Sequence, residues 1–273
     1  MKVVLKYLRI LIYSLLLFVV TILGGLYLTV LNKGFVSRQF TKSHYQTVEK
    51  NIKEEMKRSM ISSGVHDSVI DDIFTYQDVE KTVQETLSVI YDNHSYTIDT
   101  SEMLKKLEDN IQKDLESHNY KIDDEKGYHE FTSSIIKIYT KEFAMLNQVQ
   151  KVGKNVQQVT KLVVLAVASI SLLLLLVLVL RWKIYKRLIS ACLFTNSFLI
   201  LFCIYYIYEK AGLASTFIFS ETFSQVLRKT INSTFLYFRN FAIAYAILGA
   251  LIIILFVRER FKHYHKEDNI EIL

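Results

Sequence analysis

Four long apolar runs interrupt an otherwise polar chain: residues 10–31, 162–180, 188–208 and 241–257. A bilayer core of about 30 Å needs about 20 apolar residues as helix, within an accepted range of about 17–25. The second run has no charged residue at all. Lipid offers the backbone no hydrogen-bond partners, so a spanning segment of this kind must be helical. Four such runs in a soluble core would need a very large domain to cover them. The pattern therefore predicts four transmembrane helices.

The polar segment between the first two runs, residues 32–161, has helical periodicity. Its first stripe predicts one face of a helix, and the sequence Ser62-Ser63-Gly64 is typical of a helix end. The stripe consists of Val36, Phe40, Tyr45, Val48, Ile52, Met56 and Met60. No period of two is sustained in this segment, so strands are not expected.

Later in the same segment, Asp99 is a candidate N-cap with Glu102 as its capping-box partner. A last apolar stripe runs directly into the second apolar run. It predicts one helix from about Tyr128 to Leu180. We therefore predict an all-α membrane protein, with four transmembrane helices and a helical-bundle extracytoplasmic domain between the first and second spans.

The positions of lysine and arginine predict the orientation of the spans. Short cytoplasmic loops carry an excess of these residues. They precede the first run, crowd the connection between the second and third, and follow the fourth: Lys2, Lys6 and Arg9; Arg181, Lys183, Lys186 and Arg187; Arg258, Arg260, Lys262 and Lys266. Both termini are therefore expected in the cytoplasm of a multi-pass plasma-membrane protein. The first run lacks an A-x-A cleavage pattern, which favours an uncleaved signal anchor over a cleaved signal peptide.

These inferences divide the chain into nine predicted parts. They are a cytoplasmic N-terminus (1–9), span one (10–31), the extracytoplasmic domain (32–161), span two (162–180), a basic cytoplasmic loop (181–187), span three (188–208), a second extracytoplasmic loop with an amphipathic helix (209–240), span four (241–257) and a cytoplasmic tail (258–273).

Composition narrows the function and the source. The net charge of +6 would suit nucleic acid, but the basic residues lie beside the apolar runs. No zinc-finger, RNP or helix-turn-helix pattern accompanies them, so no nucleic-acid partner is expected. The chain has no proline, which suits long helices. Abundant Lys, Ile, Asn, Tyr and Phe are equally typical of an AT-rich genome, so a low-GC bacterium is the expected source.

Charge is segregated within the large polar segment. Residues 65–125 have five lysines and sixteen Asp or Glu, a net charge of −11. Residues 33–58 instead have seven basic and three acidic residues. Basic segments near the membrane would be attracted to anionic lipid, and an acidic segment farther out would avoid repulsion from it. A solvated helical surface explains the same pattern.

One local group has metal-ligand residue types: His118, Asp123, Asp124, Glu125, His129 and Glu130. Its spacing fits no HExxH or comparable signature, and acidic residues at a helix start are favoured by the helix dipole. The chain also has no P-loop and no G-x-S-x-G sequence. No metal, cofactor or catalytic residue is expected, and the protein is predicted not to be an enzyme.

Two features are candidates for contacts. Phe219, Phe223, Leu227 and Ile231 recur at helical spacing in the second outer loop and form a possible partner-docking stripe. The stripe could equally lie in the headgroup plane or pack against the protein's own helices. In the third run, Asn196 is a possible interhelical hydrogen-bonding residue.

Two functions fit this layout. The first is a non-enzymatic protein whose outer domain binds or senses a partner and acts as scaffold, regulator or relay in a membrane complex. Membrane lipids, protein partners and self-association through the outer domain are the expected interactions. The alternative is a permease-like subunit, because the layout resembles that of mechanotransmitting ABC permeases. Those proteins have an α/β outer domain and a longer cytoplasmic segment than 181–187. An enzyme acting on lipid or wall polymer lacks a candidate catalytic pair.

Overall fold

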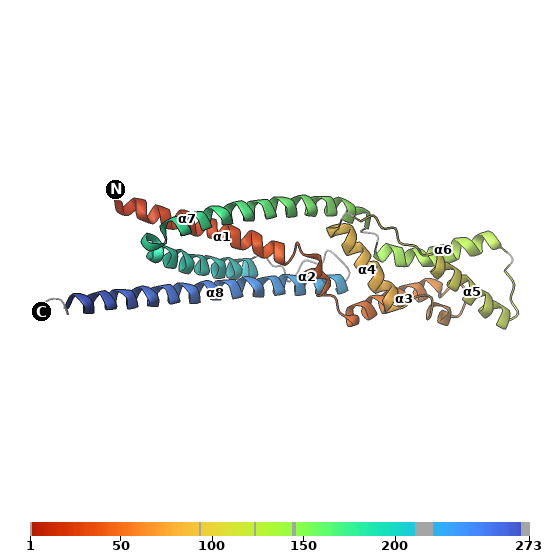
Figure 1. Cartoon of the computed structure of the whole chain (residues 1–273). Helices are drawn as coiled ribbons and strands as arrows, with labels where there is room; N and C mark the ends of the chain where they lie inside the picture. Colours follow the sequence, from red (N-terminus) through yellow and green to blue (C-terminus); the bar gives the residue numbers. More distant parts are fainter. Residues whose placement is uncertain (1, 93, 123, 144–145, 211–220, 269–273) are drawn as a thin grey trace. The chain divides into compact units, whose positions relative to one another are not determined.

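The computed structural model describes residues 2–92, 94–122, 124–143, 146–210 and 221–268. It is 84% helical, with no strand among these residues, which confirms the all-α prediction. The helices follow one another as α1 (Lys2–Leu28), α2 (Lys33–Ser37), α3 (Lys42–Met60), the 3-10 helix η1 (Asp67–Ile70), α4 (Tyr76–Tyr91), α5 (Ser101–Ser117), α6 (Glu125–Glu142), α7 (Leu146–Lys210) and α8 (Glu221–Asp268) (Figure 1).

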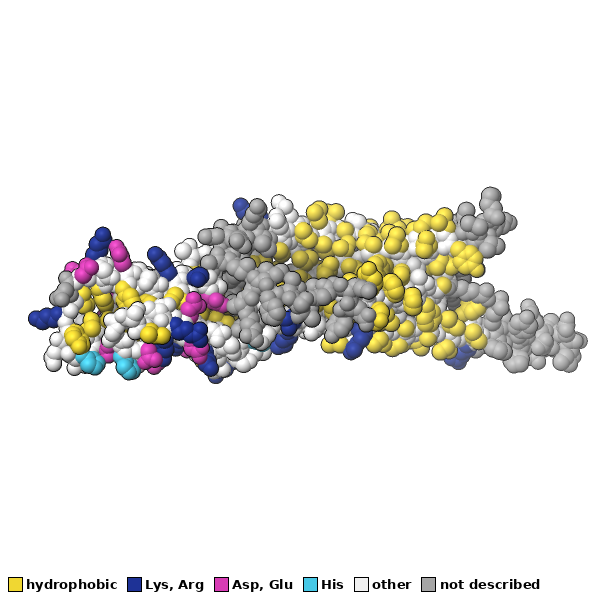
Figure 2. Space-filling view, turned by 180° about the vertical axis from the view of Figure 1, so that it is seen from behind, with side chains coloured by type: hydrophobic (Ala, Val, Ile, Leu, Met, Phe, Trp, Pro, Cys, Tyr) yellow, Lys and Arg dark blue, Asp and Glu magenta, His cyan; other side chains and the backbone are white. Residues whose placement is uncertain are grey.

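Four helical segments are long and apolar enough to cross a membrane. They are Ile10–Leu28, Gly153–Leu176, Leu188–Ile207 and Ser224–Glu259. The second and third both belong to α7, whose ribbon turns back on itself between them (Figure 1). Figure 2 shows apolar side chains covering the visible face of these segments. Four such helices are typical of a multi-pass membrane protein, as predicted.

The chain forms two compact units. The span unit comprises the described residues of Met1–Leu31, Thr160–Thr216 and Arg228–Leu273. The helical unit comprises those of Asn32–Val159 and Phe217–Leu227. The chain passes from one unit to the other after α1, within α7 and within α8. Each unit has a hydrophobic core of its own.

Helix α3 is the centre of the helical unit, where it packs against α4, α6 and η1. Its apolar residues lie on one face because they are spaced at the helical period. The core contains Tyr45, Val48, Ile52, Met56 and Met60 from α3, Val69, Ile70, Ile73 and Phe74 from the η1 region, Val79, Val83 and Leu87 from α4, Leu107 and Ile111 from α5, and Ile135, Ile136, Tyr139 and Phe143 from α6.

Local capping sets where these helices begin. At the start of α3, Thr41 and His44 form a reciprocal capping box, which separates α2 from α3 within the predicted first stripe. The predicted N-cap at Asp99 is wrong, because α5 begins after Thr100, which is its N-cap. Asp99 lies one residue earlier, where its Oδ1 accepts hydrogen bonds from the backbone N–H and hydroxyl of Ser101 (2.9 and 2.6 Å) and forms no capping box with Glu102. These two hydrogen bonds lower the pKa of the Asp99 carboxyl.

The predicted continuous helix from Tyr128 into the second span is wrong. Helix α6 ends at Glu142, and α7 begins at Leu146. Phe143, at the end of α6, is 5% exposed and has its ring 5.1 Å from that of Tyr139. Phe143 is the C-cap residue of α6, and its backbone (φ −102°, ψ 9°) has left the helical conformation. The helix that enters the span is therefore α7 alone.

In the span unit, α1, the second half of α7 and α8 pack together. Ile200, Phe238 and Ala242 form a small core, with Phe18 and Ile22 of α1 against it. Small residues allow close helix approach in membranes. A methyl group at Gly25 would lie 2.2 Å from the ring of Phe238, so α1 and α8 approach each other closely there.

Gly25→Ala is expected to lower the melting temperature of the full-length protein in detergent, although alanine favours a helix by about 1 kcal/mol over glycine. The ring of Phe238 is 6% exposed and has little room to move, and overpacking costs about 1–3 kcal/mol. Gly24→Ala is the matched control, since a Cβ there has no neighbour within 4 Å. Equal melting temperatures for the two variants would contradict the close approach.

Candidate functional site

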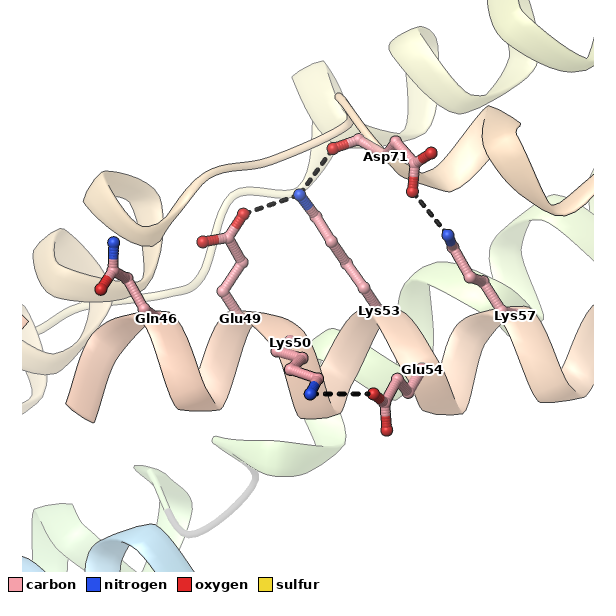
Figure 3. A pocket seen from close by; sticks show the side chains of 7 residues that line it. All are labelled: Gln46, Glu49, Lys50, Lys53, Glu54, Lys57 and Asp71. Carbon is pink, nitrogen blue, oxygen red and sulfur yellow. Dashed lines mark hydrogen bonds and ion pairs between the residues drawn. The ribbon is translucent and has the colours of Figure 1, made fainter. Parts of the chain in front are cut away.

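The helical unit has a charged groove along α3, with a volume of about 420 Å³ (Figure 3). It is lined by Gln46, Glu49, Lys50, Lys53, Glu54, Lys57 and Asp71. Lys53 donates to Glu49 at 2.7 Å and to the backbone oxygen of Asp71 at 2.6 Å, and its Nζ lies 5.1 Å from the centre of the Phe74 ring. Lys57 pairs with the Asp71 carboxylate at 2.6 Å, and this hydrogen bond raises the pKa of Lys57.

The groove residues therefore bind one another. Lys53 and Glu49 have side chains only 15% and 19% exposed, so their pairing is partly shielded from solvent. Together with Lys57 they hold the loop around Asp71 against α3. These contacts hold the loop in place, and the charged groups of the groove are paired with one another within the unit.

A second hollow, here called the distal notch, lies between the end of α5 and the start of α6. The helix α5 ends in a Schellman motif: Asn119 has a φ of 60°, and Tyr120 N–H donates to the carbonyl of Leu115 at 2.9 Å. Helix α6 starts at an N-cap, where Asp124 accepts from the N–H of Gly127 at 3.0 Å. Both motifs satisfy backbone groups that are left free at helix ends, and Tyr120 lies between them with an exposed side chain.

The notch has a volume of about 840 Å³ and combines apolar and acidic side chains. Tyr120 is 66% exposed and Ile122 is 37% exposed. Leu115 and Tyr128 are half-buried. It is lined by Gln112, Leu115, Glu116, Asn119, Tyr120, Lys121, Ile122, Glu125, Tyr128 and His129. Within the described helical unit, the other exposed large apolar residues are Ile61, Val159 and Leu227.

Glu108 of α5 ties the two walls of the notch together. Its backbone oxygen accepts from the Tyr128 hydroxyl at 3.0 Å, and its carboxylate lies 2.9 Å from Nδ1 of His129 and 3.3 Å from the hydroxyl of Thr132. Burial and the negative charges of Glu108 and Asp109 raise the pKa of Tyr128 to about 12. The Glu108 carboxylate therefore places a negative charge beside Tyr128 and His129.

The predicted docking stripe lies partly outside the described residues. Phe219 is not described, and Phe223 lies in α8 without a described side chain. Leu227 is 40% exposed and Ile231 is half-buried. The amphipathic segment and the fourth apolar run form one helix, α8, so the stripe continues straight into a candidate span.

The buried face of α8 is a different one, rotated from the stripe by about one residue. It is formed by Val226, Thr230, Thr234, Phe238 and Ala242. Thr234 donates to the backbone oxygen of Thr230 at 2.8 Å, so its hydroxyl is satisfied within the helix. Threonine and alanine are small enough for close packing in a membrane, whereas the predicted stripe consists of larger apolar residues.

Asn196 is fully buried in the span unit and points at α1. Its Nδ2 lies 3.5 Å from the hydroxyl oxygen of Thr21. That hydroxyl donates to Leu17 O at 2.7 Å and lies 2.8 Å from the Tyr245 hydroxyl. Thr21 has a single hydroxyl proton, so Tyr245 and Asn196 must donate to it. One residue from each of three helices thus meets at Thr21, and Asn196 remains proposed as the interhelical contact.

The residues with metal-ligand chemistry do not gather around one point. His118 contacts Asp114, and His129 contacts Glu108. Asp124 caps α6, while Asp123 lies outside the described residues. Among the described residues, no group of three or more His, Cys, Asp or Glu is placed to hold a metal ion.

Sequence periodicity did not identify Tyr120 and Ile122 as site residues. The available signal was two apolar residues in a turn that otherwise consists of polar residues. A turn has no helical face, so periodicity gives no signal there, and the apolar residues themselves are the signal.

In comparisons with known proteins, no family model, curated protein or solved structure matches this chain.

Proposed function

We propose that this chain is a non-enzymatic integral membrane protein whose helical unit lies outside the cytoplasm, binds a protein partner and acts as a scaffold, regulator or relay of a membrane complex. The distal notch is the observation that carries this proposal. The unit buries an extensive core elsewhere, yet it leaves Tyr120 and Ile122 exposed beside one hollow. Exposed aromatic residues at a concave surface are typical of protein contacts.

A relay role is supported by the continuity of α7. Its first turns belong to the helical unit, and the same helix continues into a candidate span. At Gly153 the helix packs directly on the backbone of α4. A shift of α4 within the helical unit would therefore move α7, which is a packed-helix displacement of the kind used in switching proteins.

Site-specific photo-crosslinking in intact expressing cells tests the binding proposal. A photoreactive residue at 120 or 122 should give a defined adduct with one protein, whereas the same residue at Glu55, exposed on α3, should not. Tyr120→Ala should reduce the adduct formed from position 122. Adducts of equal yield from all three positions, or none, would count against a docking role.

The orientation needs its own measurement. In a background with Cys192 and Cys203 changed to serine, a cysteine at Ser63 should react with a membrane-impermeant maleimide in intact cells. A cysteine at Lys183 should react only after permeabilisation. The reverse result would place the helical unit in the cytoplasm and remove the proposed outside role.

A further inference from the structure

We infer that the distal notch binds a cationic amphipathic helical segment of a partner protein, with apolar residues of that segment on Tyr120 and Ile122 and lysine or arginine side chains toward the surrounding carboxylates. The inference rests on the proposed function, because it names the chemistry of the partner that the helical unit binds.

The apolar part of the argument comes from exposure and shape. Tyr120 directly follows the positive-φ residue Asn119 of the Schellman motif and is 66% exposed, and Ile122 is 37% exposed, so both side chains lie outside the core of the unit. The half-buried Leu115 and Tyr128 extend the apolar surface inward. The hollow of about 840 Å³ falls within the roughly 300–1,000 Å³ of typical ligand sites. It can accept several side chains from one face of a helix, which is a known mode of peptide recognition.

The sign of the partner's charge follows from the residues around the notch. The described residues 108–122 and 124–130 include seven Asp or Glu and three Lys. Glu116 and Glu125 line the hollow, with Lys121 as the only lysine or arginine among the described lining residues. Complementary charge favours a cationic partner and disfavours an anionic one.

The α3 groove does not compete for such a partner. Its lysines and carboxylates are paired with each other, and it has as many lysines as carboxylates. The distal notch differs because it combines exposed apolar side chains with an excess of negative charge.

Binding can be measured with the full-length protein in nanodiscs of zwitterionic phosphatidylcholine, which have no net lipid charge. The probe is a fluorescent amphipathic peptide of leucine, alanine and lysine, about 18 residues or five turns long. A second peptide has glutamate in place of lysine. Fluorescence anisotropy with empty nanodiscs subtracted gives Kd for each.

The lysine peptide should bind, and the glutamate peptide should not. Tyr120→Ala should weaken binding roughly tenfold, as expected for truncation of an aromatic anchor. Glu116→Gln/Glu125→Gln should weaken it by roughly fivefold or more and reduce its dependence on salt. The control Glu55→Gln/Glu80→Gln removes the same charge from exposed positions elsewhere on the unit and should leave Kd unchanged.

Equal weakening by the notch and control variants would overturn the inference, as would equal binding of both peptides. Photo-crosslinks from positions 120 and 122 separate this failure from failure of the proposed function. If a defined protein adduct forms but the lysine peptide does not bind, docking stands and the cationic segment is rejected. If neither is seen, both proposals fail.

Discussion

Gly153→Ala is expected to loosen the contact between α7 and α4 and to destabilise the helical unit. A Cβ at this position would lie 2.7 Å from the backbone oxygen of Val89 and 3.2 Å from the Cα of Ile90. Backbone atoms cannot rotate away as a side chain can, so α4 or α7 must shift. Overpacking of this kind costs about 1–3 kcal/mol, which opposes the roughly 1 kcal/mol by which alanine favours the helix.

Hydrogen–deuterium exchange of the full-length protein in nanodiscs measures this effect. Amides of α4 (Tyr76–Tyr91) and of the first turns of α7 should exchange faster in Gly153→Ala and faster still in Gly153→Leu. Lys154→Ala is the neighbouring control, because this side chain is exposed. Unchanged protection of α4 in the leucine variant would show that the close approach does not exist in solution.

The largest loss of stability is expected from Tyr139→Ala. Tyr139 is fully buried, its ring is 5.0 Å from that of Phe74 in an edge-to-face arrangement, and its hydroxyl lies 2.9 Å from that of Thr82. Truncation of a buried aromatic residue costs about 3–5 kcal/mol. Tyr139→Phe keeps the packing and loses only the hydrogen bond, which contributes about 1 kcal/mol.

Tyr120→Ala is the matched control for this series, because the same change at a residue 66% exposed should alter stability by less than about 0.5 kcal/mol. Exchange protection of α3, α4 and α6 should therefore follow the order Tyr120→Ala, Tyr139→Phe, Tyr139→Ala. A Tyr120→Ala protein that loses partner binding while keeping full protection would separate docking from folding. Equal loss of protection in both alanine variants would contradict the assigned core.

The sequence predicted the parts of the fold that depend on local pattern. The stripe from Tyr45 to Met60 became the buried face of α3, because side chains at helical spacing share one side whatever they pack against. The end near Gly64 was predicted from its turn residues, and Gly64 has the positive φ of 76° that glycine allows. The four apolar runs could be recognised in the sequence because a helix must have a minimum length to span a bilayer.

Contacts between residues that are distant in the sequence could not be predicted from local patterns. Gly153 is a weak point by helix propensity, yet in the structure it is the position where α7 meets the backbone of α4. The buried face of α8 is rich in threonine and was passed over for a neighbouring stripe of larger residues. In both cases steric fit against the partner helix determines which residue type is accommodated at the contact.

For this protein, the sequence by itself determined the helical class, the four apolar segments and the segregation of charge, because each depends on residue type and spacing along one helix. Only the tertiary structure decided where α6 ends, which face of α8 is buried and that Tyr120 and Ile122 share a hollow with two carboxylates. These features depend on which helices meet and on the space left between them. A one-dimensional pattern does not contain that information, because the contacting residues are far apart in the chain.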